Sequence, residues 1–133
     1  RIFEIAGSGM SAQSVRLNTV ASNLANAESV SGDPARVYRA KHPVFQATQP
    51  EKSGDIGSAV SVSAIMESQA APEQRYDPGN PLADATGYVY APNVNTVEEM
   101  VDMISASRSY QNNVEVMTTA RNLMLATLKL GQG

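Results

Sequence analysis

The sequence contains no cysteine and no tryptophan, and it has one histidine, His42. Without cysteine the chain has no means to form a disulfide, a thiolate zinc site, an iron–sulfur cluster or a cysteine nucleophile. The context Lys41-His42-Pro43 offers no nearby pattern for a second metal ligand, so a surface histidine is favoured over a ligand. We therefore expect no metal, no cofactor and no enzymatic activity.

The sequence also has no excess of basic over acidic residues. The 10 lysines and arginines are outnumbered by 13 acidic residues, and the isoelectric point is about 5.0, which argues against nucleic-acid binding. No run approaches the length of apolar sequence that a membrane-spanning helix needs, so we expect no membrane span. The first residues, Arg1 to Ile5, lack the charged-then-apolar layout of a secretory signal.

Large apolar side chains are also scarce. The apolar set makes up 42% of the 133 residues, but 18 of its members are alanine, and Leu, Ile, Val and Phe together number only 27. That content lies near the limit at which a chain buries enough apolar surface to fold alone. The composition fits a subunit that completes its burial against partners better than a self-sufficient domain.

Proline is absent from both ends of the chain. All seven prolines lie between positions 34 and 92, and proline breaks helices by removing a hydrogen bond and clashing with the preceding turn. We therefore divide the chain into an N-terminal helix (1–28), a loop and hairpin region (29–95) and a C-terminal helix (96–130). Together they form one structural unit that assembly completes.

The N-terminal segment shows a heptad pattern that predicts a helix to about Ala27, with Asn26 as a plausible stop. Gly7-Ser8-Gly9 interrupts it, and the two glycines favour fraying or bending of the first turns. Two series of seven-residue spacing carry the pattern: Phe3, Met10, Leu17, Leu24 and Ala6, Gln13, Val20, Ala27.

The C-terminal segment begins with Thr96, which we expect to cap the helix while Glu99 reaches back to complete a capping box. Three-four spacing then continues to Lys129, which predicts a rod on the order of 50 Å. Four of the six methionines lie on this seam, and methionine suits packing against more than one neighbour. A two-helix hairpin with an ordinary methionine-lined core is the alternative.

The middle region has strand-like composition at 37–41, 44–46, 59–66 and 86–90, and residues 48–55 favour a loose hairpin turn. The predicted fold is mainly α with a small β element. The long terminal helices form an antiparallel coiled-coil-like pair, and the middle is rich in loops and β-hairpins.

Carboxylates in the middle region are the remaining candidates for chemistry. Glycoside hydrolysis needs only two, but five among mostly loop residues is an ordinary frequency, so we do not favour catalysis. The dense turn formers of 75–81 indicate a rigid β-turn. The five carboxylates are Asp55, Glu67, Glu73, Asp77 and Asp84.

The stretches 8–13, 17–18 and 21–27, which include Ser8-Gly9-Met10-Ser11-Ala12-Gln13, resemble the signature helix of bacterial flagellar axial proteins. The stretches 76–85, 87–89, 92–95 and 103–116 are similar to the proximal rod proteins of the flagellar basal body. The resemblance covers nearly the whole chain and weakens over about 48–60.

The resemblance implies a structural subunit that polymerises through its terminal helices into a hollow drive shaft, which transmits torque and passes exported subunits. The rod crosses the periplasm, and its subunits leave through the flagellar type III export apparatus without a cleaved signal. The implied partners are other copies of the chain, proximal and distal rod proteins, the protein joining the rod to the MS ring, and the export apparatus.

The resemblance and the heptads together suggest a helix–helix and assembly interface. For Asn23, capping or local turn formation competes with hydrogen bonds between subunits, and the second is slightly favoured. Tyr110 is either an anchor between subunits or a core tyrosine. The interface residues are Met10, Leu17, Val20, Asn23, Leu24, Met100, Ile104, Tyr110, Val114, Met117 and Leu128.

Two other functions stay open on sequence grounds. One is a secreted helical adaptor that forms a defined small complex with one partner. The other is a small hydrolase that uses the loop carboxylates Asp77 or Asp84.

Overall fold

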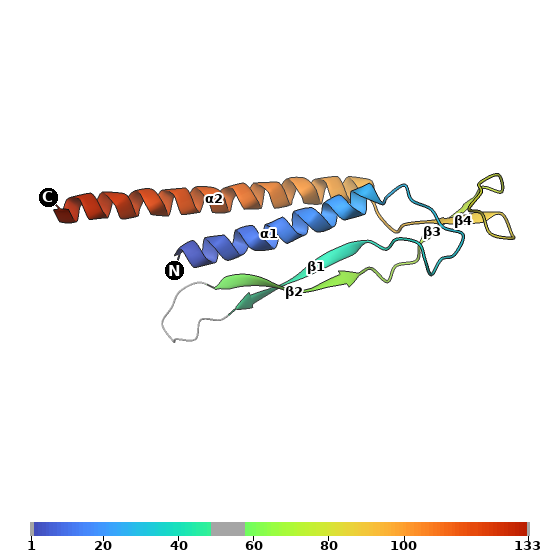
Figure 1. Cartoon of the computed structure of the whole chain (residues 1–133), viewed down its shortest axis with the longest axis horizontal. Coiled ribbons are helices and arrows are strands. Elements are labelled where there is room, and N and C mark those ends of the chain that lie inside the picture. Colours follow the sequence, from blue (N-terminus) through green and yellow to red (C-terminus); the bar gives the residue numbers. More distant parts are fainter. Residues whose placement is uncertain (1, 49–57, 133) are drawn as a thin grey trace.

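The computed structural model describes residues 2–48 and 58–132, and two long helices dominate it. The helices lie side by side in antiparallel orientation, and the second extends well past the first (Figure 1). This arrangement, with its small strands, confirms the predicted fold class. The elements are α1 (Ile2–Ala25), β1 (Lys41–Thr48), β2 (Ala59–Glu67), β3 (Glu73–Tyr76), β4 (Tyr88–Ala91) and α2 (Thr96–Gln132).

One asparagine directly follows α1 and another directly precedes α2, and the side chain of each satisfies backbone groups. The Asn26 side-chain amide donates to the Ser22 carbonyl at 2.9 Å, close to the predicted stop of α1. At the start of α2 the predicted cap is wrong. The Asn95 side-chain oxygen, rather than Thr96, accepts from the amides of Val97 at 3.1 Å and Glu98 at 3.2 Å, as an N-cap does. The side chain of Glu99 turns toward α1 and does not reach back to complete a capping box.

Strands β1 and β2 form an antiparallel hairpin that packs along α1 (Figure 1). Its register runs from the pair Lys41 and Glu67 to the pair Thr48 and Ala59, with a bulge after Val44. The Val60 amide donates to the Ser8 hydroxyl of α1 at 3.0 Å, which fixes the hairpin against the helix. Residues 49–55 of the predicted turn lie outside the described residues.

The strand predicted at 37–41 does not form. The amides of Ala40 and Lys41 donate to the side-chain oxygens of Asn93 at 2.8 Å and Asn23 at 2.9 Å. Asparagine side chains therefore take the place of a strand partner, and β1 begins only at Lys41.

A second small sheet lies at the far end of the molecule, where β3 pairs with β4. The sequence predicted β4 two residues too early, and β3 was missed because its residues border a dense turn. Gly87 adopts a φ of 88°, and a side chain there would meet the Tyr76 ring at 2.9 Å, so glycine is required on both counts.

The buried core is thin and consists mainly of small residues. Asn23 is the largest side chain that is fully buried. The described helices include none long and apolar enough to cross a membrane. The buried apolar residues are Ala6, Ala12, Val20, Val37, Ala40, Val89, Ala91 and Ala106.

Candidate assembly interface

The face of α2 that contacts α1 follows alternating four- and three-residue spacing. Small side chains let the helices approach closely: Ala106 has 0% exposure, and a β-carbon on Gly9 would lie 2.8 Å from the Asn113 amide nitrogen. The contact therefore depends on fit rather than on bulky apolar residues. The buried and half-buried residues of this face are Glu99, Met103, Ala106, Tyr110, Asn113, Met117 and Ala120.

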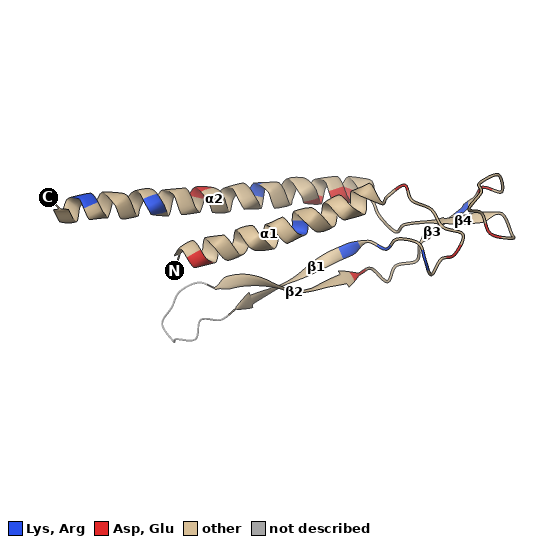
Figure 2. Cartoon of the chain, viewed as in Figure 1, with Lys and Arg blue, Asp and Glu red and all other residues tan. Residues whose placement is uncertain are grey.

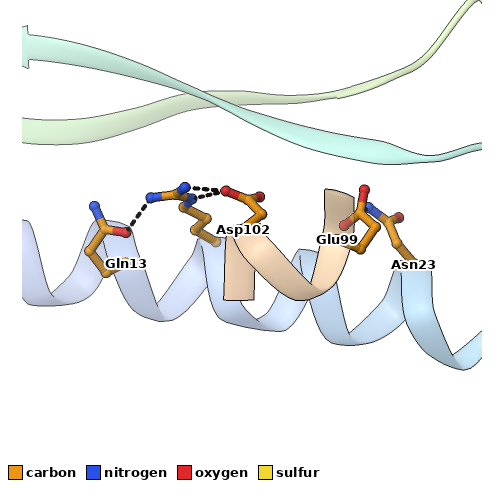
Figure 3. A network of polar contacts seen from close by, with 5 residues as sticks. Gln13, Asn23, Glu99 and Asp102 are labelled. Atoms are coloured by element: carbon orange, nitrogen blue, oxygen red, sulfur yellow. Dashed lines mark hydrogen bonds and ion pairs between the residues drawn. The ribbon is translucent and has the colours of Figure 1, made fainter. Parts of the chain in front are cut away.

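A buried polar cluster joins the end of α1 to the start of α2 (Figure 3). The Asn23 amide nitrogen donates to the Lys41 carbonyl at 2.9 Å and to Glu99 Oε2 at 3.1 Å. Its oxygen accepts from the Lys41 amide at 2.9 Å and from the Tyr38 hydroxyl at 2.7 Å. We call Asn23, Tyr38, Lys41 and Glu99 the Asn23 cluster.

The Asn23 amide makes four hydrogen bonds within the chain, two as donor and two as acceptor. A primary amide has two donor hydrogens and two acceptor lone pairs, so none is left over. The hydrogen bonds of Asn23 therefore join segments of one subunit, and a place for Asn23 in an interface between subunits stays a prediction. Periodicity does not reveal this role, because the partners Tyr38, Lys41 and Glu99 are far away in sequence.

A second polar contact holds the helices together two turns away. The Arg16 guanidinium donates to Asp102 Oδ1 from Nε at 2.8 Å and from a second nitrogen, and it also donates to Gln13 Oε1 at 3.2 Å (Figure 3). The pair is only partly exposed, with 21% and 35% of the side chains accessible. Both nitrogens donate to the same oxygen of Asp102, so this charge-assisted contact ties the two helices together at one point, and we expect it to help set their register.

On α1, the structure places the predicted interface residues in contact with the rest of the chain. Val20 and Asn23 are buried, at 2% and 0% exposure, while Met10, Leu17 and Leu24 are half-buried.

On α2, the predicted residues divide into two groups. Tyr110 and Met117 are half-buried on the face toward α1. The exposed fractions of Met100, Ile104, Val114 and Leu128 are 55%, 57%, 39% and 57%, so these four do not form the expected buried seam with α1. Their place in an interface between subunits stays a prediction.

The last part of α2 has no partner within the described chain. Ile2, where the described part of α1 begins, shares a groove with Ala120 and Leu123. Apart from Leu123, residues 121–132 do not line this groove, and all of them are exposed at the end of α2 that extends past α1 (Figure 1). We call them the overhang. It carries exposed apolar side chains at Leu123, Met124, Leu125, Leu128 and Leu130.

The carboxylates proposed for catalysis serve in turns. Asp84 Oδ1 accepts from the amides of Thr86 and Tyr88, both at 2.9 Å, and from the Thr86 hydroxyl at 2.7 Å. The Tyr88 amide, followed by the Thr86 hydroxyl, lowers the pKa of Asp84 below its ordinary value. A carboxylate that stays ionised and occupied by turn donors is poorly placed to act as a general acid.

The other perturbed carboxylate is also paired locally. Its hydrogen bond and charge interaction with Arg75 lower the pKa of Glu73. Among residues 2–48 and 58–132, no group of three or more histidine, aspartate or glutamate side chains is placed to hold a metal ion.

Comparison with known proteins matches both ends of the chain to families of flagellar rod proteins. Residues 3–32 match the family described as flagella basal body rod protein, and residues 85–130 match the C-terminal family of flagellar basal body rod FlgEFG proteins. These two ranges include most of α1 and most of α2.

Several relatives match the chain over nearly their whole length and carry the same name. The chain is 56% identical over 131 residues to the flagellar basal-body rod protein FlgC of Salmonella typhimurium, and 57% identical over 132 residues to that of Yersinia enterocolitica. The Bacillus subtilis protein of the same name is 36% identical over 145 residues. Each match covers 98% of this chain and 96% of the relative. The chain belongs to the FlgC family of flagellar basal-body rod proteins.

Proposed function

We propose that this chain is a structural subunit of the proximal rod, which polymerises through its terminal helices into a hollow shaft. The observation that carries the proposal is the unpartnered apolar surface of α2. Met100, Ile104 and Leu128 are each more than half exposed, while the buried core consists largely of alanine. A surface of this kind in a helix pair supports burial against other subunits.

The interface we propose retains the eleven residues identified from sequence, in two roles. Val20, Leu24 and their neighbours hold α1 to α2 within a subunit. Met100, Ile104, Val114 and Leu128 contact adjacent subunits. The division 1–28, 29–95 and 96–130 then separates two assembly helices from a middle region that contacts neighbouring rod components.

The proposed partners are other copies of this chain, the proximal and distal rod proteins, and the protein that joins the rod to the MS ring. We also propose export through the flagellar type III apparatus, with no cleaved signal, and a final place in the rod where it crosses the periplasm. A thin, alanine-rich core supports this route because it is easily unfolded for passage.

Association-dependent folding tests the proposal. We expect the purified chain to be weakly helical by circular dichroism at low concentration, and to gain helix when it is concentrated or mixed with other rod proteins. A cooperative melt that does not depend on concentration would contradict this. Electron microscopy separates an open helical polymer from the small closed complex that an adaptor would form.

A further inference from the structure

The overhang carries one continuous stripe of apolar and basic side chains. Positions 121, 124, 125, 128 and 129 follow the i, i+3, i+4, i+7 spacing of a single helix face. Met124, Leu125 and Leu128 are 53%, 46% and 57% exposed. Arg121 and Lys129 flank them and are the only charged residues between positions 116 and 132.

A groove lined by valines and carboxylates lies near the opposite end of the helix pair. Its volume is about 480 Å³, and the first turns of α2 line it together with one residue each from α1 and β1. Val97 and Val101 line it with 68% and 61% of their surface exposed. The remaining lining residues are Arg16, His42, Glu98, Glu99, Asp102 and Ser105.

The charges of the groove and the overhang are complementary. The groove holds three carboxylates against one guanidinium, and that guanidinium is already paired with Asp102. Figure 2 shows the acidic residues near the start of α2 and basic residues toward its C-terminal end. An apolar helix stripe flanked by two cations therefore fits a valine-lined groove with an exposed carboxylate at Glu98.

We propose that the overhang of one copy of this chain docks in this groove of a second copy. The inference rests on the proposed rod function and names the contact between successive subunits. Leu125 and Leu128 pack against Val97 and Val101, and a basic flanking residue approaches Glu98. Because the two halves of the contact lie at opposite ends of the helix pair, a subunit docked at one end keeps its other end free. The pairing that we propose is heterologous, and it continues as an open chain of subunits because it closes neither as a ring nor as a reciprocal dimer.

The absence of cysteine in the native chain makes a disulfide test specific. Val101→Cys and Leu128→Cys are introduced together in the full chain, which is then concentrated and oxidised. We expect a ladder of dimers, trimers and longer species on a non-reducing gel. The matched control replaces Val101→Cys with Thr86→Cys, an exposed position at the β3–β4 end, and should give no ladder.

Single-cysteine chains check the direction of the contact. A dimer as abundant with Leu128→Cys alone as with the pair would show tail-to-tail contact and overturn the proposal. Sedimentation of the same samples tests the docking contact and the proposed rod function separately. Self-association without the ladder would overturn this contact and leave the rod function standing, while no association alone or with other rod proteins would overturn both.

Charge reversal tests independently the proposed pairing between the basic residues of the overhang and Glu98. Arg121→Glu with Lys129→Glu should lower the ladder yield at low salt by roughly fivefold, because the pair with Glu98 is lost, and Glu98→Lys in the same chain should restore part of it. Arg36→Glu, a reversal at an exposed loop arginine, is the control and should leave the yield unchanged. An equal loss in the control, or no rescue, would contradict the proposed pairing.

Discussion

The Asn23 cluster and the overhang are opposite kinds of structure in one helix pair. In the first, an asparagine with 0% exposure makes four hydrogen bonds to three segments of the chain. In the second, residues 121–132 expose every side chain, including Leu128 at 57% and Leu130 at 83%. Polar contacts thus hold the subunit together, while much of its apolar surface faces outward.

The largest expected effect on folding comes from removing Asn23. Asn23→Ala leaves the buried Glu99 carboxylate without its donor and the Lys41 amide without its acceptor. We expect a loss of about 3 kcal/mol in the free energy of unfolding. Urea unfolding followed by circular dichroism, at one fixed protein concentration, measures it. Asn18→Ala changes an exposed asparagine on the same helix and is the control; equal effects would show that the cluster contributes little.

The Arg16 pair should contribute less, because it is partly exposed. Arg16→Gln is expected to cost about 1 kcal/mol, since a charge-assisted hydrogen bond is lost but water replaces part of it. A double-mutant cycle with Asp102→Asn isolates the coupling between the two side chains. A coupling indistinguishable from zero would mean that the pair does not set the helix register.

The sequence predicted the helices well and the face of α2 poorly, and the reason lies in the residues. Proline exclusion and heptads define the two helices without any knowledge of contacts. On α2, however, the stripe with Met100 and Ile104 and the stripe with Met103 and Ala106 both satisfy three-four spacing. Polar contacts to α1 select the second stripe, and hydrophobic periodicity does not count them.

The same limit applies to the cap of α2. Thr96 and Asn95 both have capping side chains, and only the position of Glu99 decides between them. That carboxylate is drawn to Asn23, a residue 76 positions away. A long-range hydrogen bond therefore competes with the local capping-box pattern, and the N-cap of α2 lies at Asn95, one residue before the predicted cap.

Two glycines of α1 offer a graded test of how closely the helices fit. Nothing lies within 4 Å of a β-carbon at Gly7, so Gly7→Ala should stabilise the helix by about 1 kcal/mol. At Gly9 the β-carbon would crowd Asn113, whose amide nitrogen donates to the Ser109 carbonyl at 2.9 Å. Gly9→Ala should therefore give little or none of that gain by thermal unfolding.

The gain at Gly9 should return when the crowding is removed. In an Asn113→Ala background, Gly9→Ala is expected to stabilise by about 1 kcal/mol, as Gly7→Ala does alone. If Gly9→Ala matches Gly7→Ala in the native background, the helices are less tightly fitted at this point than the buried face indicates.

The smallest expected effect on the folding of a single subunit is in the overhang. Leu125→Ser with Leu128→Ser changes side chains without a partner in the described chain, so the helicity of the variant at low concentration should match that of the native chain. On concentration, the native chain should gain stability by mass action and the variant should not. Unfolding curves at two concentrations distinguish these effects. Loss of stability at the low concentration would mean that the overhang serves the fold of its own subunit, and the contrast with the Asn23 cluster would fail.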